Sequence, residues 1–443
     1  MRKAGWLVVF IFICIIVWNY DVRIDKSDKC MVEDWNMIET NTLPHEKFHA
    51  EMMKEKLGLI DTLINETPSP FSAFAYPDHI AVTLTSELNY SSSVYCRYFD
   101  CKMREISNPF ESKIFPQSTV FCGRRVGAEF ISITMNLHDE PEFPIRIIPR
   151  IQKRPKHFFT VCLSPLYGEE PKFLQIAEFI EYYKLQGATF FHVYIRNISN
   201  YDRILLDDYV RTGEIEVIKM HDHYWRADFM WHRVQINECH RRSKNFAKWT
   251  AFIDIDEKII MKKSPELRIV DFLNQLAPNV SIIKLAIEWV IKNQQSPAKY
   301  INDEQLKNEI SFKKFTNTST KSDDKLQPKC IIRPELFAIM TIHHAVGIYE
   351  KSEIAIVNTT IASVRHYRNT YDKFFLYQVS RMLKHGPWVQ SEVAPWIIGN
   401  VTENVLKRVT YLYNIADPPE NGTEIYYKHE GSRLENNKKR KIT

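Results

Sequence analysis

The sequence lacks a strong imbalance of charge. Its 59 Lys and Arg residues nearly balance its 54 Asp and Glu residues, and the formal net charge is +5 over 443 residues. The basic residues are scattered apart from a short run at 438–441, so charge gives no indication of a nucleic-acid partner. The chain does not have the low apolar content of a disordered protein. Its 44% apolar residues are enough to form the core of one large domain or of two.

The apolar stretch at the amino terminus lacks a small-residue cleavage pattern. Arg2 and Lys3 precede this stretch, which covers residues 4–18. It is shorter than the roughly 20 residues of a typical membrane span, and the core of a signal peptide can also be this short. We favour a signal anchor at residues 4–20, with a cytosolic tail at 1–3 and, by the positive-inside rule, the rest of the chain in a lumen.

Two residue patterns test this orientation. In an oxidising lumen, cysteines form disulfides more readily than metal sites, and an odd number leaves one thiol free or paired between chains. Cys14 lies in the apolar stretch, and the others are Cys30, Cys96, Cys101, Cys122, Cys162, Cys239 and Cys330. Asn-x-Ser/Thr sequons exceed what composition alone gives, which favours the lumen. They begin at Asn65, Asn89, Asn197, Asn279, Asn317, Asn358, Asn400 and Asn421.

The rest of the chain divides into four segments by pattern. Residues 21–70 are polar, apart from a short helix near 45–64, and are expected to form a stem. Residues 71–150 carry short alternating runs, which indicate a β-rich accessory module that supports packing or, alternatively, binds sugar. Residues 151–415 are expected to form an α/β domain, and residues 416–443 a polar, basic tail.

Strand and helix periods alternate regularly in the α/β domain. Strand patterns at 158–163, 189–195, 214–220 and 249–253 are separated by helical patterns near 173–183, 202–210 and 229–242. Repeated βα units predict a mostly parallel, Rossmann-like sheet flanked by helices. Open sheets of this kind bind ligands at the carboxyl ends of their strands.

Two carboxylates follow the last of these strands. Alternation along a strand predicts that Asp254 and Asp256 project to the same side, where they would repel one another unless a cation lies between them. Oxygen ligands suit Mg²⁺ or Mn²⁺, which leave coordination positions for water or substrate phosphates. Asp-x-Asp alone also fits a charged turn, but its place at a strand end favours a metal–diphosphate site.

Several blocks of sequence, in the same order, resemble glycosyltransferase family 92. They are residues 178–187, 192–199, 235–239, 249–257, 331–334, 343–344 and 364–368. The resemblance covers about half of the chain. It implies a GT-A fold, a uridine diphosphate sugar as donor, dependence on Mn²⁺ (or Mg²⁺), and inverting transfer of a hexose, usually galactose, to a glycan acceptor. It also implies a single-pass type II protein of the Golgi membrane, with a lumenal catalytic domain.

The resemblance assigns roles at the metal site. Asp256 is expected to ligate the metal, while Asp254 reaches the donor ribose or metal-bound water. His366 is the expected third ligand, and His343 and His344 are its rivals. Glu257 orients a ligand or is a surface charge.

Other expected site residues lie nearby in the sequence. Tyr194, Asn197 and Asp202 fall at or after the second strand end, where the nucleobase or ribose of the donor would lie. Gln235 matches the family pattern on the helix before the metal strand. A structural role is the alternative for each. Inversion requires a general base. Glu288, Asp303 and Glu304 lie after the metal strand, where acceptor-side residues of GT-A enzymes fall, and Asp303 is the candidate among them.

Two alternatives stay open. The spacing of His221 and His223 would fit two zinc ligands, but no third candidate ligand lies at a sequence spacing typical of a zinc site. The alternative to an enzyme is a catalytically inactive lumenal carbohydrate-binding or scaffold protein of the same fold, since residues 288–297 lack the glycine that many family members carry. The joint presence of Asp254, Asp256 and His366 favours the enzyme.

Overall fold

The described part of the chain forms two compact units. The computed structural model describes residues 30, 32–56, 67–85, 92–115, 118–223, 228–321, 328–343, 345–349, 352–370 and 376–414. The first unit comprises described residues up to 47 and within 57–115 and 119–151, and the second comprises those within 48–56 and from 152 onward. The expected anchor at 4–20 and tail at 416–443 lie outside the described residues. Within the described ranges, no helix is long and apolar enough to cross a bilayer.

The first unit is a β-rich module, as predicted. Its strands form one sheet in the order β4-β3-β6-β7-β1-β2-β5, and its neighbouring strands are antiparallel except for β1 and β7. The alternating runs at 79–85, 93–99, 119–122 and 129–135 predicted β2, β3, β5 and β6 but not the other three strands. Of these three, β4 contains a proline and a residue with positive φ, Asn108. The strands are β1 Pro70–Ala75, β2 Ile80–Leu84, β3 Ser93–Phe99, β4 Glu105–Lys113, β5 Thr119–Cys122, β6 Phe130–Thr134 and β7 Ile145–Pro149.

Part of the expected stem is folded onto this module. The short 3-10 helix η1 spans Asp34–Asn36, and its Trp35 packs against the β core. A disulfide joins Cys30 to Cys101, and Arg125 Nη1 donates a hydrogen bond to the Thr40 carbonyl at 2.9 Å. The predicted short helix is present as α2, Glu46–Lys56.

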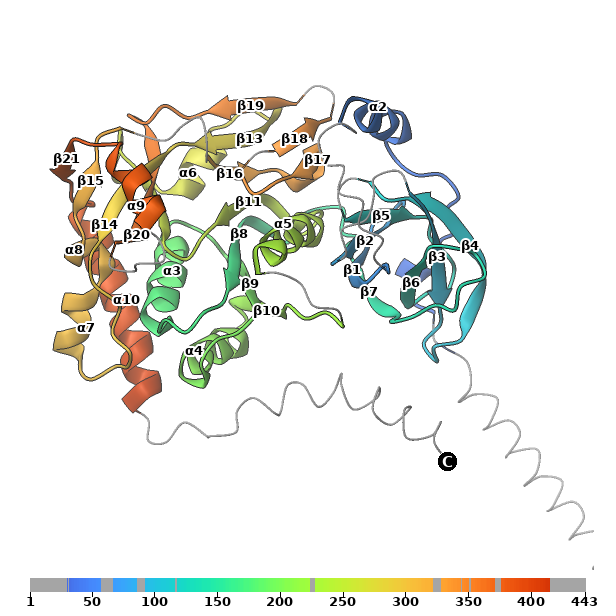
Figure 1. The fold of residues 1–443 in the computed structure, drawn as a ribbon, viewed down its shortest axis with the longest axis horizontal. Helices are drawn as coiled ribbons and strands as arrows, with labels where there is room; N and C mark the ends of the chain where they lie inside the picture. The colour runs from blue at the N-terminus through green and yellow to red at the C-terminus, as the bar shows by residue number, and fades with distance from the viewer. Residues whose placement is uncertain are drawn as a thin grey trace, which may run out of the picture. The chain divides into compact units, whose positions relative to one another are not determined.

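The second unit contains the predicted α/β sheet (Figure 1). Its strand order is β10-β9-β8-β11-β16-β13-β19. The first four strands are mutually parallel, and β16 is antiparallel to both of its neighbours. The fold is therefore the mostly parallel, Rossmann-like arrangement expected of a GT-A domain. The strands are β8 His157–Leu166, β9 Phe190–Ile195, β10 Ile215–Lys219, β11 Ala247–Ile253, β13 Val280–Leu285, β16 Lys329–Ile332 and β19 Glu353–Ile356.

The predicted helices link these strands. They are α3 Phe173–Leu185, α4 Asn200–Arg211 and α5 Asp228–Ser243. Helix α3 ends at Leu185, and Gly187 follows two residues later with φ +95°. Gly187 lies so close to Val270 that a Cβ would be 2.3 Å from the Val270 side chain, so only glycine fits there. A late helix, α10 (Pro395–Asn414), packs along α3 and α4 (Figure 1).

A smaller sheet completes the second unit. Its order is β12-β20-β14-β15-β21, and β12 leaves the main sheet's strand β11 through a turn at 254–256. The strands are β12 Glu257–Met261, β14 Ile287–Lys292, β15 Asn317–Ser319, β20 Ala362–Asn369 and β21 Trp388–Gln390. The remaining elements are α6 Ile269–Asn274, α7 Asp303–Glu309, α8 Ser311–Lys314, η2 Pro334–Leu336, β17 Phe337–Met340, β18 Ala345–Ile348 and α9 Leu376–Leu383.

The cysteines follow the expectation of disulfides with one thiol left over. Besides Cys30–Cys101, disulfides join Cys96 to Cys122 in the β module and Cys162 to Cys239 between β8 and α5. Cys330 on β16 is buried and takes part in none of these three disulfides.

Candidate active site

A tight turn at the carboxyl end of β11 holds the acidic residues together. Strand β11 ends at Ile253, so Asp254 and Asp256 lie in the turn itself and strand alternation does not govern their directions. The Asp254 amide donates to Glu257 Oε2 at 3.0 Å, and the Glu257 amide donates to the Asp254 carbonyl at 3.1 Å. The Glu257 side chain is 0% exposed. Glu257 is therefore a buried support of the turn and not a surface charge.

His366 faces the turn from β20. It pairs with Glu257 in the β12–β20 register, its Nε2 lies 3.2 Å from Asp256 Oδ2, and its Nδ1 lies 3.3 Å from Glu257 Oε1. The ring also stacks on Trp289 of β14, with centroids 4.9 Å apart and planes at 24°. The Trp289 ring and the nearby Glu257 carboxylate thus hold the ring so that one nitrogen points at Asp256, although Nδ1 and Glu257 Oε1 form no hydrogen bond with each other.

Asp254 also contacts two other basic residues, which no pattern in the sequence predicts there. Lys329 Nζ, at the start of β16, lies 2.7 Å from Asp254 Oδ2 and 3.0 Å from Glu257 Oε2. On the other side, His232 Nε2 of α5 lies 3.8 Å from Asp254 Oδ1. The two aspartates of the motif therefore have different partners.

These partners keep both aspartates ionised. Burial alone would raise the pKa of each carboxyl group, but the charge of Lys329 lowers the pKa of Asp254, and the charge of His366 lowers that of Asp256 to about 2. Burial followed by the charge of Asp254 raises the pKa of Glu257. Two ionised, partly exposed carboxylates at a strand end are suited to attract a cation.

The residues present fit a divalent ion held by few protein ligands. Asp256 offers an oxygen and His366 a nitrogen, a donor set that suits Mn²⁺. A carboxylate at the other ring nitrogen, here Glu257, is the usual support of a metal-binding histidine. Within the described ranges, no three His, Cys, Asp or Glu side chains are grouped as a metal site. Further ligands would have to come from phosphates and water, as is common for ions that bind nucleotides.

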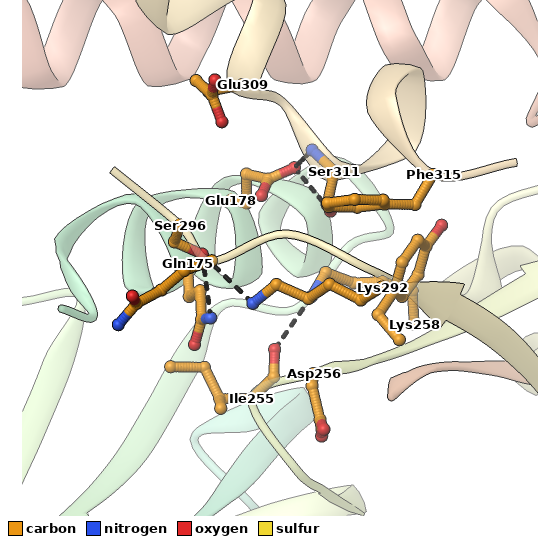
Figure 2. Close-up of a pocket in the computed structure, with 12 residues that line it drawn as sticks. Gln175, Glu178, Ile255, Asp256, Lys258, Lys292, Ser296, Glu309, Ser311 and Phe315 are labelled. Carbon is orange, nitrogen blue, oxygen red and sulfur yellow. Dashed lines mark hydrogen bonds between the residues drawn. The ribbon is translucent and has the colours of Figure 1, made fainter. Parts of the chain in front are cut away.

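A small polar pocket of about 20 Å³ adjoins Asp256 (Figure 2). Two buried ammonium groups line it, from Lys258 and Lys292. Lys292 Nζ and Gln175 Nε2 both donate to Ser296 Oγ, at 3.2 and 3.1 Å. Such closely placed donors and acceptors suit a ligand rich in hydroxyl groups.

Gln235 lies on α5, one turn after His232. It is 1% exposed, and neither its amide nitrogen nor its amide oxygen has a hydrogen-bond partner among the described residues. Buried polar groups without partners are costly and rare. The amide of Gln235 therefore has unused hydrogen-bonding capacity among the described residues.

The other expected donor residues do not join the carboxylates. Tyr194 is fully buried, and its hydroxyl donates to Glu238 of α5. Asp202 is 2% exposed, and its Oδ1 accepts from the Lys172 and Phe173 amides at 2.9 and 2.7 Å. It thereby caps helix α3. Asn197 is exposed just after β9.

Asp303 and the rivals of His366 also lie elsewhere. Asp303 is exposed at the start of α7, where it accepts hydrogen bonds from Tyr300 and Thr410, each at 2.6 Å. It does not line the pocket beside Asp256. The His343 carbonyl accepts from the Cys330 thiol at 3.7 Å, and His344 lies outside the described residues. His221 and His223 pack ring to ring with centroids 5.9 Å apart.

The second unit therefore combines a mostly parallel α/β sheet with an aspartate–histidine pair at the end of a central strand. Residues 157–408 match glycosyltransferase family 92, and the chain belongs to this family. One relative is the beta-1,4-galactosyltransferase galt-1 of Caenorhabditis elegans, which is 25% identical over 241 residues. The match covers 51% of this chain and 52% of that protein, so the chain spans about half the length of this relative.

Solved structures show weaker similarity. The mannosyltransferase PcManGT from Pyrobaculum calidifontis, in complex with GDP-Man and Mn²⁺, is 10% identical with a TM-score of 0.29, and the match covers 63% of this chain and 81% of that one. Glucosyl-3-phosphoglycerate synthase from Mycobacterium tuberculosis, in complex with Mn²⁺, uridine diphosphate and glucosyl-3-phosphoglycerate, is 11% identical with a TM-score of 0.26, covering 60% and 82%. TM-scores this low carry no argument about this chain.

Proposed function

We propose that the protein is a metal-dependent, inverting glycosyltransferase that moves a hexose from a uridine diphosphate sugar to a glycan acceptor in the Golgi lumen. The arrangement of Asp256 and His366, with Glu257 fixing the histidine ring, carries the proposal. Family membership supports sugar transfer. The name of the nematode relative supports galactose as the sugar.

In this proposal Asp256 and His366 hold the divalent ion. A bound ion would neutralise charge on the diphosphate leaving group and so lower the barrier to transfer. Asp254 faces the same end of β11, and the unpartnered amide of Gln235 lies on the neighbouring helix. We assign both to the donor nucleoside, since a nucleobase or ribose would satisfy the buried amide.

The pocket beside Asp256 has room for about one hydroxyl group of the sugar. Its polar side chains come from α3, β14 and the segment around α8, and Figure 2 shows Gln175, Lys292 and Ser296 joined by hydrogen bonds. Asp303 stays a prediction for the general base, and its contacts with Tyr300 and Thr410 do not favour it.

The cysteine pairing supports a lumenal compartment. Three disulfides among the described residues are typical of proteins that fold in the secretory pathway. A type II signal anchor at residues 4–20 would keep the protein in the Golgi membrane, with the two described units in the lumen.

The test is transfer by the purified full-length protein. Nucleotide release is measured with a panel of uridine diphosphate sugars and Mn²⁺, with and without glycan acceptors. We expect Mn²⁺-dependent release that acceptor stimulates, and a loss of at least about a hundredfold in His366→Ala. If every donor fails while the protein still binds glycans, the inactive carbohydrate-binding alternative is correct.

A further inference from the structure

Lys329 is a buried cation within the acidic turn. Its side chain is 4% exposed, and its ammonium group contacts both Asp254 and Glu257, at 2.7 and 3.0 Å. It reaches them because β16 runs antiparallel to β11, with Phe252 opposite Cys330. The start of β16 therefore lies beside the end of β11.

This contact divides the acidic residues into two groups. Asp256 is matched by His366, which lies 3.2 Å away. Asp254 lies between Lys329 and His232. A divalent ion at Asp254 Oδ2 would have to displace the ammonium group or lie within a few ångströms of it, where repulsion between the two cations is strong.

We propose that Lys329 is a positioning residue that holds Asp254 and Glu257 away from the metal ion, so that Asp256 and His366 alone, among these side chains, bind it. The inference rests on the proposed metal-dependent function and refines it. Asp254 then keeps Oδ1 for the donor nucleoside, and Glu257 keeps its contact with His366.

A merely structural lysine would behave differently on removal. Loss of structure at the turn would weaken Mn²⁺ binding. In our proposal, Lys329→Met removes one positive charge and leaves the carboxylates of Asp254, Asp256 and Glu257 facing only two histidines, His232 and His366. Their attraction for a divalent ion should then increase, even though the protein becomes less stable.

The experiment measures Mn²⁺ binding by the full-length protein without nucleotide, using electron paramagnetic resonance of free Mn²⁺. We expect Lys329→Met to bind Mn²⁺ at least about tenfold more tightly than wild type, and Lys329→Arg to bind it within about threefold of wild type. Lys172→Met is the matched control, because Lys172 is also buried but contacts carbonyls of residues 168 and 170. It should leave Mn²⁺ affinity unchanged. Weaker binding by Lys329→Met would overturn the proposal.

A second variant covers the case in which Lys329→Met does not fold. Asp254→Asn keeps the size of the side chain and removes its charge. If Asp254 is not a ligand, Asp254→Asn should weaken Mn²⁺ binding at least about tenfold less than Asp256→Asn does, because it removes only a charge beside the ion whereas Asp256→Asn also removes a ligand. Equal losses of affinity in the two variants would refute the proposal while leaving metal-dependent transfer intact. If the wild-type protein binds no Mn²⁺, the proposed metal dependence and this inference both fail.

Discussion

Asp202 allows a test of whether its side chain caps helix α3 or binds the donor nucleotide. Asp202 Oδ1 accepts from the Lys172 and Phe173 amides, and Ser199 Oγ donates to Oδ2 at 2.7 Å. Helix α3 has no capping side chain of its own at Lys172. Each hydrogen bond to a charged group contributes about 1.5–3 kcal/mol, and an N-cap contributes about 1 kcal/mol. Asp202→Ala should therefore lower the free energy of unfolding by about 3–5 kcal/mol.

Urea unfolding measures this loss, and calorimetric titration of uridine diphosphate with Mn²⁺ measures donor binding. We expect Asp202→Asn, which keeps an acceptor oxygen, to lose about 1–2 kcal/mol and to bind uridine diphosphate within about twofold of wild type. Asp207→Ala is the control on the same helix, because Asp207 forms a partly exposed pair with Arg203 and should cost less than about 1 kcal/mol. A tenfold loss of nucleotide affinity in Asp202→Asn would refute the capping account.

Three further predictions follow from single residues. Glu257→Gln should weaken Mn²⁺ binding about 10- to 100-fold, because the carboxylate that orients His366 is lost; unchanged affinity in the resonance assay would contradict this. Burial, followed by the charge of Arg241, lowers the pKa of His240 well below its usual value. The folded state therefore binds fewer protons at this site than the unfolded state does. The free energy of unfolding should fall as the pH drops below about 6.5, by up to about 1.4 kcal/mol per pH unit. His240→Gln should flatten this dependence of the urea midpoint between pH 7.5 and 5. Asn358 is exposed, and its Oδ1 accepts hydrogen bonds from the Thr360 amide and hydroxyl, each at 2.9 Å. In a lumen, Asn358 should carry an N-glycan. The mass of Asn358→Gln should then be lower than that of wild type by one glycan, and a glycosidase that removes N-glycans should abolish this difference.

The sequence predicted the α/β domain because its elements are locally encoded. Apolar residues of α3 recur at helical spacing, and the strands are short apolar runs bounded by glycines such as Gly187 and Gly213. The same reasoning placed Asp254 and Asp256 at the end of a central strand, as the structure confirms. In the β module, alternation failed at β4, where a proline interrupts the pattern.

The partners of the acidic residues could not be predicted in this way. Lys329 reaches Asp254 across 75 positions of sequence through the pairing of β16 with β11, and strand order is a tertiary property. Glu257 looked equally suited to the surface, because its burial depends on contacts with Lys329 and His366 from two other strands. The one local signal at Lys329 is a charge directly before the apolar run of β16, which is also common at exposed strand ends.

The most direct measurement of the central claim is Mn²⁺-dependent nucleotide release by wild type and by Asp256→Asn, assayed side by side with the same uridine diphosphate sugar. The account predicts that wild type releases nucleotide only with the ion present and that Asp256→Asn loses at least about a hundredfold in rate while its thermal unfolding stays close to wild type. Equal rates in the two proteins would contradict it.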